Sequence, residues 1–272
     1  MKYQTISLPA TLSPQGTLTL YIQETYQGFG LQTRPMVLIC PGGGYGPPSL
    51  REGEPLAIAF LNMGCHVAVL RYSPAPARYP TQLVESAWAM KFLREHAEEW
   101  HITPNKFLVL GCSAGGHLAA NLGVAWQEEW LSKAVGANTP EAIQPNGLIL
   151  CYPVITAGEH RNTGSFEALL GENNTPEERE KHSLETKVNP QTPPAFLWHT
   201  YDDFVVPVEN SLLFAQALRK YNIPCELHIY PKGVHGLSLA NELTEIHNHE
   251  HNFVVPEVQG WVNLAKTWIE NL

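Results

Sequence analysis

Short apolar runs alternate along the chain with longer segments whose apolar residues recur every three or four positions. Runs such as MVLIC and VAVLRY are nearly continuous, which is typical of strands buried on both faces of a parallel sheet. The alternation predicts an α/β fold in which crossover helices join the strands. The predicted strands are Leu18–Gln23, Met36–Cys40, His66–Tyr72, Lys106–Gly111, Gly147–Tyr152, Ala195–His199 and Cys225–Tyr230. The predicted helices are Glu54–Met63, Thr81–Trp100, Gly115–Trp126, Val208–Tyr221 and Pro256–Asn271.

The segment from about Val154 to Pro194 interrupts this pattern. It is polar and contains only short helical patterns such as SFEALL and TPEEREKH. Because it has too few apolar residues for a core of its own, a separate domain is not expected. We predict a single domain over residues 1–272, with this segment as a small cap beyond a strand end.

The composition is that of an ordinary globular protein, with 44% hydrophobic and 16% charged residues. No apolar run reaches the roughly 18 residues that a membrane helix needs, and the first residues lack the apolar core of a signal peptide. We therefore expect a cytoplasmic protein with no membrane partner. Nucleic acid is also not an expected partner, because the formal net charge is −9 and such binding depends on lysine and arginine.

Neither the cysteines nor the histidines form a pattern that requires a metal. The five cysteines are odd in number and lack paired short spacing, so we expect reduced thiols rather than disulfides or a zinc site. His247, His249 and His251 alternate in HNHEH, and imidazole is a common metal ligand. Because H-E-x-x-H is absent and no acidic partner pattern accompanies the run, it is interpreted as a solvated loop before the last helix. We predict no metal or organic cofactor, and the sequence leaves homo-oligomerisation open.

The pentapeptide GCSAG lies between the apolar run FLVLG and the helical pattern that begins at Gly115. In G-x-S-x-G the glycines relieve crowding at a sharp strand-to-helix turn and leave the serine hydroxyl exposed above the sheet. A helix that starts after Ser113 also favours the negative charge that develops in acyl transfer. The alternative is a tight turn with an idle serine. The placement between strand and helix favours Ser113 as a nucleophile.

Three successive glycines follow the predicted strand MVLIC, in the segment PGGGY. Without a Cβ, their backbone N–H groups can approach a substrate oxygen closely, although the same residues could form a flexible turn. A glycine loop at this place can supply part of an oxyanion hole, which the residue after the nucleophile completes. We therefore predict Gly43, Gly44 and Ala114 as donors. Pro41 occupies the position where such a loop usually has histidine.

A serine nucleophile needs a base, and the base needs an orienting acid, in the chain order serine, acid, histidine. His235 follows the last predicted strand, in PKGVHGL, and is the predicted base. His117 lies on the helix after Ser113, where a packing or capping role suits it better. The acid is expected after the strand AFLWHT, where two aspartates are adjacent. Asp203 is favoured as the acid, while Asp202 could instead brace the turn.

Taken together, these segments resemble the esterase branch of the α/β-hydrolases, which includes bacterial acetyl esterases, acetyl-xylan-esterase-like enzymes and relatives of the hormone-sensitive lipases. The resemblance rests on PGGGY, LRYSPAPARYPTQ, GCSAGGHLA, TPPAFLWHTYDDFVVPVENS and GVHGL. It extends from about Val37 to His235 and continues into the last helix. It implies an α/β-hydrolase fold and a catalytic triad of Ser113, Asp203 and His235.

The resemblance also implies a serine esterase that hydrolyses short acyl esters, with acetylated sugars as a substrate class. Aromatic residues near strand ends or site loops could stack on a sugar, although packing is the more frequent role of such rings. The alternatives are a peptidase of the prolyl-oligopeptidase type, which usually has a large extra domain, a lipase, which needs an apolar lid, and a non-catalytic binding protein. The aromatic candidates are Tyr45, Tyr72, Tyr79, Trp198 and Phe204.

Overall fold

A mixed sheet of eight strands forms the centre of the described part of the chain. The computed structural model describes residues 1–26, 28, 30–247 and 250–272. The sheet has the order β1-β2-β4-β3-β5-β6-β7-β8, and β2 pairs antiparallel with β1 and β4, whereas the other pairs are parallel. The strands are β1 (Lys2–Ser7), β2 (Thr17–Ile22), β3 (Arg34–Cys40), β4 (His66–Arg71), β5 (Ile102–Cys112), β6 (Gly147–Cys151), β7 (Ala195–Thr200) and β8 (Cys225–Tyr230).

This architecture confirms the α/β prediction, and each predicted strand is present with ends shifted by at most a few residues. The largest shift is in β5, which begins at Ile102 rather than Lys106. The sequence pattern does not predict β1. That strand lies at the sheet edge and is almost entirely exposed, so it lacks the apolar run that marks the buried strands.

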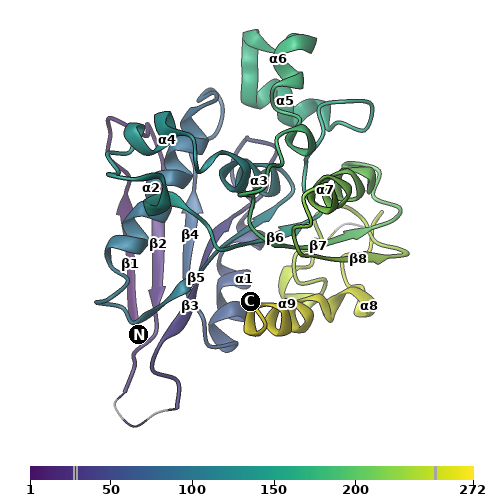
Figure 1. Cartoon of the computed structure of the whole chain (residues 1–272). Helices are drawn as coiled ribbons and strands as arrows, with labels where there is room; N and C mark the ends of the chain where they lie inside the picture. Colours follow the sequence, from purple (N-terminus) through teal and green to yellow (C-terminus); the bar gives the residue numbers. More distant parts are fainter. Residues whose placement is uncertain (27, 29, 248–249) are drawn as a thin grey trace.

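Helices cover both faces of the sheet (Figure 1). The predicted helix over residues 81–100 ends early, because the chain turns after Glu95 and Ile102 then pairs with β3. The predicted helix over residues 256–271 is divided at Gly260. None of the described helices is both long and apolar enough to span a membrane. The helices are α1 (Glu54–Asn62), α2 (Thr81–Glu95), α3 (Ala114–Ala125), α4 (Glu129–Ala134), α5 (Thr163–Leu170), α6 (Pro176–Glu180), α7 (Glu209–Lys220), α8 (Pro256–Gln259) and α9 (Trp261–Glu270).

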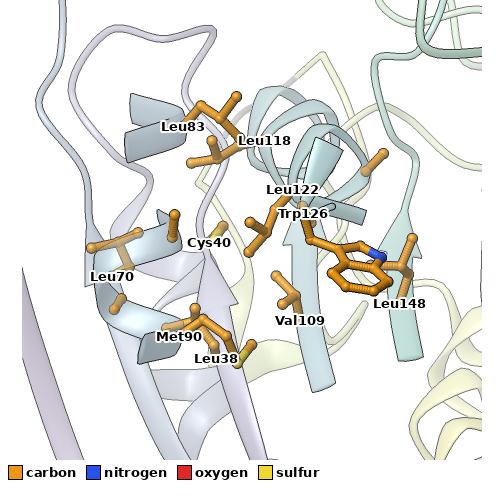
Figure 2. Close-up of a cluster of buried hydrophobic side chains, with 14 of the residues drawn as sticks. Leu38, Cys40, Leu70, Leu83, Met90, Val109, Leu118, Leu122, Trp126 and Leu148 are labelled. Atoms are coloured by element: carbon orange, nitrogen blue, oxygen red, sulfur yellow. The ribbon is translucent and has the colours of Figure 1, made fainter. Parts of the chain in front are cut away.

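Successive residues of each central strand belong to different hydrophobic cores, because side chains alternate between the two faces of a sheet. Leu38 of β3 packs in the core under α2 and α3, with Met90 and Leu118 (Figure 2). Its neighbour Val37 packs in the opposite core, with Trp261 of α9. Both faces therefore require apolar residues, which explains the nearly continuous hydrophobic runs of the central strands.

Residues 154–194 connect the end of β6 to β7 and contain α5 and α6 (Figure 1). Phe166 and Leu170 of α5 are buried in the same core as α2 and α3. The side-chain oxygen of Asn210, on α7, accepts hydrogen bonds from the N–H groups of Ile155 at 2.8 Å and Thr156 at 3.0 Å. The segment is thus attached to the main body at the carboxyl ends of the strands.

His117 of α3 is completely buried and packs against the ring of Tyr45. Its Nε2–H donates to the His182 carbonyl at 3.0 Å, so Nδ1 carries no hydrogen and accepts from the Tyr45 hydroxyl at 2.7 Å. Burial lowers the pKa of the His117 imidazole to about 4. The ring is therefore neutral in the folded protein, and the packing role predicted for it is confirmed.

We expect His117 to make the fold sensitive to acid. The unfolded chain binds a proton at this imidazole near its ordinary pKa of 6.5, whereas the folded protein does not bind it until about pH 4. Stability therefore falls as the pH drops through this range, by about 2 kcal/mol between pH 7 and pH 5. Urea unfolding at the two pH values measures the effect, and His117→Gln should lose about 2 kcal/mol less than the wild type.

His101→Asn is the matched control for this measurement. His101 is exposed, and its left-handed backbone, with φ 53°, is one that asparagine tolerates. The control should keep the acid sensitivity of the wild type. Equal losses in the wild type and in His117→Gln would contradict the assignment.

Candidate active site

Ser113 lies at the sharp turn between β5 and α3. Its backbone has φ 55° and ψ −120°, a conformation that residues with a side chain rarely adopt. The turn is packed so closely that a Cβ on Gly115 would lie 2.0 Å from the Cys40 carbonyl oxygen. The Ser113 N–H donates to the Cys151 carbonyl, and its own carbonyl accepts from the Val154 N–H, both at 3.0 Å. These contacts fix the serine at the carboxyl end of the central strand.

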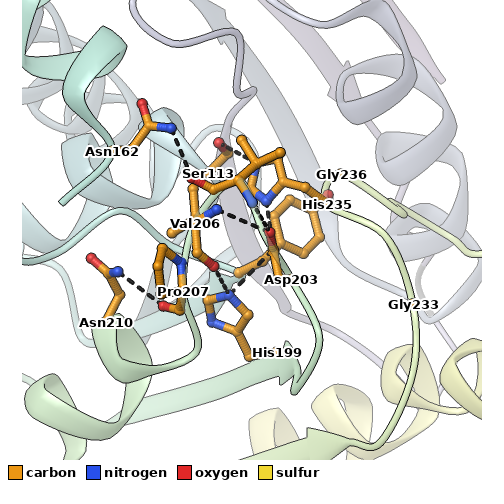
Figure 3. A network of polar contacts seen from close by, with 12 residues as sticks. Ser113, Asn162, His199, Asp203, Val206, Pro207, Asn210, Gly233, His235 and Gly236 are labelled. Carbon is orange, nitrogen blue, oxygen red and sulfur yellow. Dashed lines mark hydrogen bonds and ion pairs between the residues drawn. The ribbon is translucent and has the colours of Figure 1, made fainter. Parts of the chain in front are cut away.

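Two hydrogen bonds connect Ser113 with residues from the ends of β7 and β8 (Figure 3). Ser113 Oγ lies 2.7 Å from His235 Nε2, and His235 Nδ1 lies 2.6 Å from Asp203 Oδ2. Because an ionised carboxylate can only accept, Nδ1 carries the hydrogen and Nε2 accepts from the serine hydroxyl. The structure thus brings together the three residues that the sequence motifs and their order select.

The Asp203 side chain is fully buried, with hydrogen-bond donors on all sides. Its Oδ1 accepts from the N–H groups of Val205 and Val206, both at 2.9 Å. Burial alone would raise the pKa of the Asp203 carboxyl, but the nearby Nε2–H of His199 and the hydrogen bond from His235 outweigh it and hold that pKa well below its ordinary value. The carboxylate is therefore ionised, and it can orient the imidazole and stabilise its protonated form.

Asp202 has a different partner. Its Oδ1 accepts from the Gly233 N–H at 2.8 Å, two residues before His235. Asp202 thus holds the loop that carries the imidazole, while Asp203 contacts the imidazole itself. The two adjacent aspartates therefore have separate places in the site.

His199 is a site residue that the sequence does not reveal. Its Nε2–H donates to the Val206 carbonyl at 2.9 Å, and its Nδ1 accepts from the Ser211 hydroxyl at 2.8 Å. This orientation brings Nε2 to 3.4 Å from Asp203 Oδ2. A histidine inside the apolar strand AFLWHT is interpreted first as a core residue, and only its position four residues before Asp203 could have indicated a second role.

The glycine loop lies directly beside Ser113. A Cβ built on Gly42 would be 3.0 Å from Ser113 Cβ, and the next two residues, Gly43 and Gly44, have φ of 129° and 62°, which favour glycine. Within the described part of the chain, the N–H groups of Gly43, Gly44 and Ala114 have no hydrogen-bond partner. Unpaired donors next to an activated hydroxyl suit attack on a carbonyl carbon, because they can bind the oxyanion that forms.

Three of the aromatic residues suggested as substrate contacts lie in the hydrophobic cores. Tyr45 and Tyr72 are each 1% exposed and Trp198 is 0% exposed, so these rings offer no face to a sugar, contrary to the prediction. The Tyr72 hydroxyl donates to the Pro41 carbonyl at 2.7 Å, and Trp198 stacks on Trp261 with ring centroids 5.3 Å apart. These rings therefore pack beneath the site rather than lining it.

The other two aromatic candidates differ in exposure. Phe204, next to Asp203, is 68% exposed, and its ring centroid lies 5.7 Å from that of His251. Tyr79 is partly buried and packs edge-on against His182 at 4.3 Å. Phe204 therefore remains a candidate for substrate contact, whereas Tyr79 has a packing partner.

The described residues contain no group of three or more His, Cys, Asp and Glu side chains that could hold a metal ion. Of the predicted histidine run, His249 lies outside the described residues, and His251 packs on Phe204. All five cysteines are free thiols, and Cys225 is exposed whereas the other four are buried.

Comparison with known proteins relates this site to a family. A model of the BD-FAE family matches residues 26–218. The endo-1,4-beta-xylanase B of Butyrivibrio fibrisolvens is 40% identical over 217 residues, which are 77% of this chain and 33% of that protein. The acetylxylan esterase of Xylanibacter ruminicola is 31% identical over 206 residues, 74% of this chain and 40% of that protein. The chain thus spans between a third and two fifths of the length of these two curated relatives.

Solved structures extend the similarity to nearly the whole chain. The acetyl ester-xyloside bifunctional hydrolase from Caldicellulosiruptor lactoaceticus has a TM-score of 0.81 at 36% identity, covering 94% of this chain and 88% of that chain. A carboxylesterase from Lactobacillus plantarum has a TM-score of 0.86 at 26% identity, covering 100% of this chain and 98% of that chain. An α/β-hydrolase from a deep-sea metagenome has a TM-score of 0.78 at 32% identity, covering 100% and 97%. The fold is that of the α/β-hydrolases, and the chain belongs to the BD-FAE family.

Proposed function

We propose that the protein is a serine carboxylesterase that removes short acyl groups, above all acetyl groups, from carbohydrates. The observation that carries the proposal is the hydrogen-bonded chain from Ser113 through His235 to Asp203, beside the unpaired N–H groups of the glycine loop. The names of similar proteins, an acetylxylan esterase, an acetyl ester-xyloside hydrolase and carboxylesterases, support ester hydrolysis and suggest the acetylated sugar.

In the proposed mechanism, His235 Nε2 takes the proton of the Ser113 hydroxyl as its Oγ attacks the ester carbonyl carbon. The buried Asp203 carboxylate stabilises the imidazolium, and the N–H groups of Gly43, Gly44 and Ala114 bind the oxyanion. The twelve-residue helix α3 begins at Ala114, so its N-terminal dipole also favours the negative charge.

Collapse of the tetrahedral intermediate breaks the ester C–O bond, and His235 gives its proton to the departing alcohol. The acyl group remains on Ser113 Oγ. Water then attacks this acyl-enzyme while His235 again accepts a proton, and the acid is released. The cycle uses only groups of this chain and a water molecule.

We expect Ser113→Ala to lower the turnover of p-nitrophenyl acetate by at least about 10⁴-fold, because among the described residues no other hydroxyl is hydrogen-bonded to His235. The measurement is initial rates at pH 7.5, with circular dichroism to check the fold. Ser86→Ala is the matched control, since this buried hydroxyl donates only to the Leu83 carbonyl of its own helix. Near-wild-type turnover in Ser113→Ala would contradict the nucleophile assignment.

The adjacent aspartates allow a second test by an isosteric pair of variants. Asp203→Asn should lower kcat by about 10³- to 10⁴-fold, because an amide cannot hold the imidazole in its useful tautomer. Asp202→Asn should lower kcat less than about 10-fold, because the amide oxygen can still accept from the Gly233 N–H. Steady-state kinetics of both variants decide the matter. The assignment is wrong if Asp202→Asn has the larger effect.

A substrate panel tests the acyl group and the alcohol. We expect acetylated xylo-oligosaccharides and p-nitrophenyl acetate to react at least about 10-fold faster, in kcat/KM, than p-nitrophenyl palmitate. Peptide amides should not be cleaved. Faster hydrolysis of the long acyl chain would indicate a lipase, and cleavage of amides would indicate a peptidase.

A further inference from the structure

A buried carboxylate lies directly behind the glycine loop. Glu52, at the end of a short 3-10 turn (Leu50–Glu52), is 3% exposed. Its Oε2 accepts from the Gly42 N–H at 2.8 Å. A Cβ built on Gly42 would lie 2.7 Å from this oxygen and 3.0 Å from Ser113 Cβ. One glycine therefore separates the carboxylate from the nucleophile.

The second oxygen of the same carboxylate reaches the loop that carries the base. Glu52 Oε1 accepts from the Tyr152 hydroxyl at 2.7 Å, and the Tyr152 oxygen accepts from the Ser238 N–H at 3.1 Å. The Tyr152 ring packs edge to face against the His235 ring, with centroids 5.1 Å apart. Glu52 thus links the glycine loop to both the ring and the loop of His235.

Arg51 strengthens this connection from the other side. Its Nη1 donates to the Gly236 carbonyl at 2.9 Å, and its Nε donates to the Thr244 carbonyl. The Ser238 hydroxyl in turn donates to the Arg51 carbonyl at 2.7 Å. Arg51 therefore holds the segment that follows His235 at three points, and Glu52 reaches it through Tyr152. Of these two residues, Glu52 is the one that also holds the glycine loop.

The charge of Glu52 and its hydrogen bonds have opposite effects on the proposed reaction. A negative charge near a developing oxyanion raises the energy of the transition state by Coulomb repulsion. Hydrogen bonds to a carboxylate, by contrast, are short and strong, and they can fix a backbone N–H within the narrow range that an oxyanion hole needs. A buried carboxylate here therefore helps the reaction only if fixing the N–H groups of the glycine loop lowers the barrier more than the repulsion of the oxyanion raises it.

We propose that Glu52 is a positioning residue of the esterase, with Tyr152 as its partner. By holding the Gly42 peptide, Glu52 sets the direction of the following Gly43 and Gly44 N–H groups, and through Tyr152 it sets the position of the His235 ring. Glu52 contacts neither the reacting atoms nor the substrate. This inference rests on the proposed function, and it adds a residue pair that no sequence motif marks.

The test uses Glu52→Gln, Tyr152→Phe and the double variant. The Gly42 N–H and the Tyr152 hydroxyl donate to different oxygens of Glu52. Glutamine replaces one of these oxygens with an NH2 group, which cannot accept, so one of the two hydrogen bonds is lost. With p-nitrophenyl acetate, kcat should fall by about 10- to 100-fold in Glu52→Gln and about 10-fold in Tyr152→Phe, with KM within about threefold of the wild type. The kcat of the double variant should be within about twofold of that of Glu52→Gln, because both substitutions disrupt the same connection between Glu52 and Tyr152.

Glu85→Gln is the matched control. Glu85 is also a buried carboxylate, and it accepts from the Ser73 N–H at 2.8 Å and from the Ser13 and Ser73 hydroxyls, neither of which belongs to the glycine loop or to the loop of His235. Its kcat should stay within about twofold of the wild type even if its thermal stability falls. A kcat in Glu52→Gln that equals or exceeds that of the wild type, or a loss that Glu85→Gln matches, would overturn the proposal.

A second measurement separates this inference from the proposed function. A fluorophosphonate phosphonylates an activated serine: the Ser113 Oγ–P bond forms, fluoride leaves, and His235 takes the hydroxyl proton. If the wild type is labelled but hydrolyses no ester of the panel, the proposed substrate class is wrong. The labelling rate still tests the role of Glu52 in that case, because it does not depend on the substrate. That rate should be at least about 10-fold lower in Glu52→Gln, or in Tyr152→Phe if the former does not fold. Equal labelling rates, or a wild type that is not labelled, would overturn the inference.

Discussion

The strand-to-helix turn at Ser113 is the constraint on which the rest of the site depends. A side chain at φ 55° and ψ −120° costs on the order of 1–3 kcal/mol, and it persists only where neighbours fix the backbone. Here β6 holds the serine peptide through Cys151, and Gly115 allows the turn to press against the end of β3. The glycine loop follows β3 directly, so the same contact that makes the turn possible also brings the loop to the serine.

The fold could be predicted well where burial determines the sequence. Central strands such as β3 have both faces in a core, so the buried residues 36–40 of that strand are all apolar and the run is evident. The edge strand β1 was missed because its exposed side chains carry no such constraint. The boundary errors at Glu95 and Gly260 arise from tertiary contacts, since the amphipathic pattern continues past the point where the chain must turn.

The sequence predicts which residues gather at the site, but not the direction in which neighbouring side chains point. Ser113 and His235 are marked by glycine-flanked motifs at the ends of strands, and Asp203 follows from the chain order. The direction of a side chain depends on the local backbone, and Tyr45 and Trp198 turn into the cores although they are neighbours of site residues in the sequence. Residues that act through a hydrogen bond, such as His199 and Glu52, have no motif because only the folded chain gives them partners.

The place of β8 at the edge of the sheet affects how the protein loses its active site on heating or in denaturant. In the sheet of described residues, β8 is the edge strand next to β7 and is partly exposed, whereas β5, which leads to Ser113, lies between β3 and β6. Opening an edge strand requires less free energy than unfolding a core. Heat or denaturant should therefore draw the imidazole away from the hydroxyl while both cores remain packed. Inactivation then precedes global unfolding as a separate transition. The stability of the edge strand β8, rather than that of the cores, sets the highest temperature at which the site stays assembled.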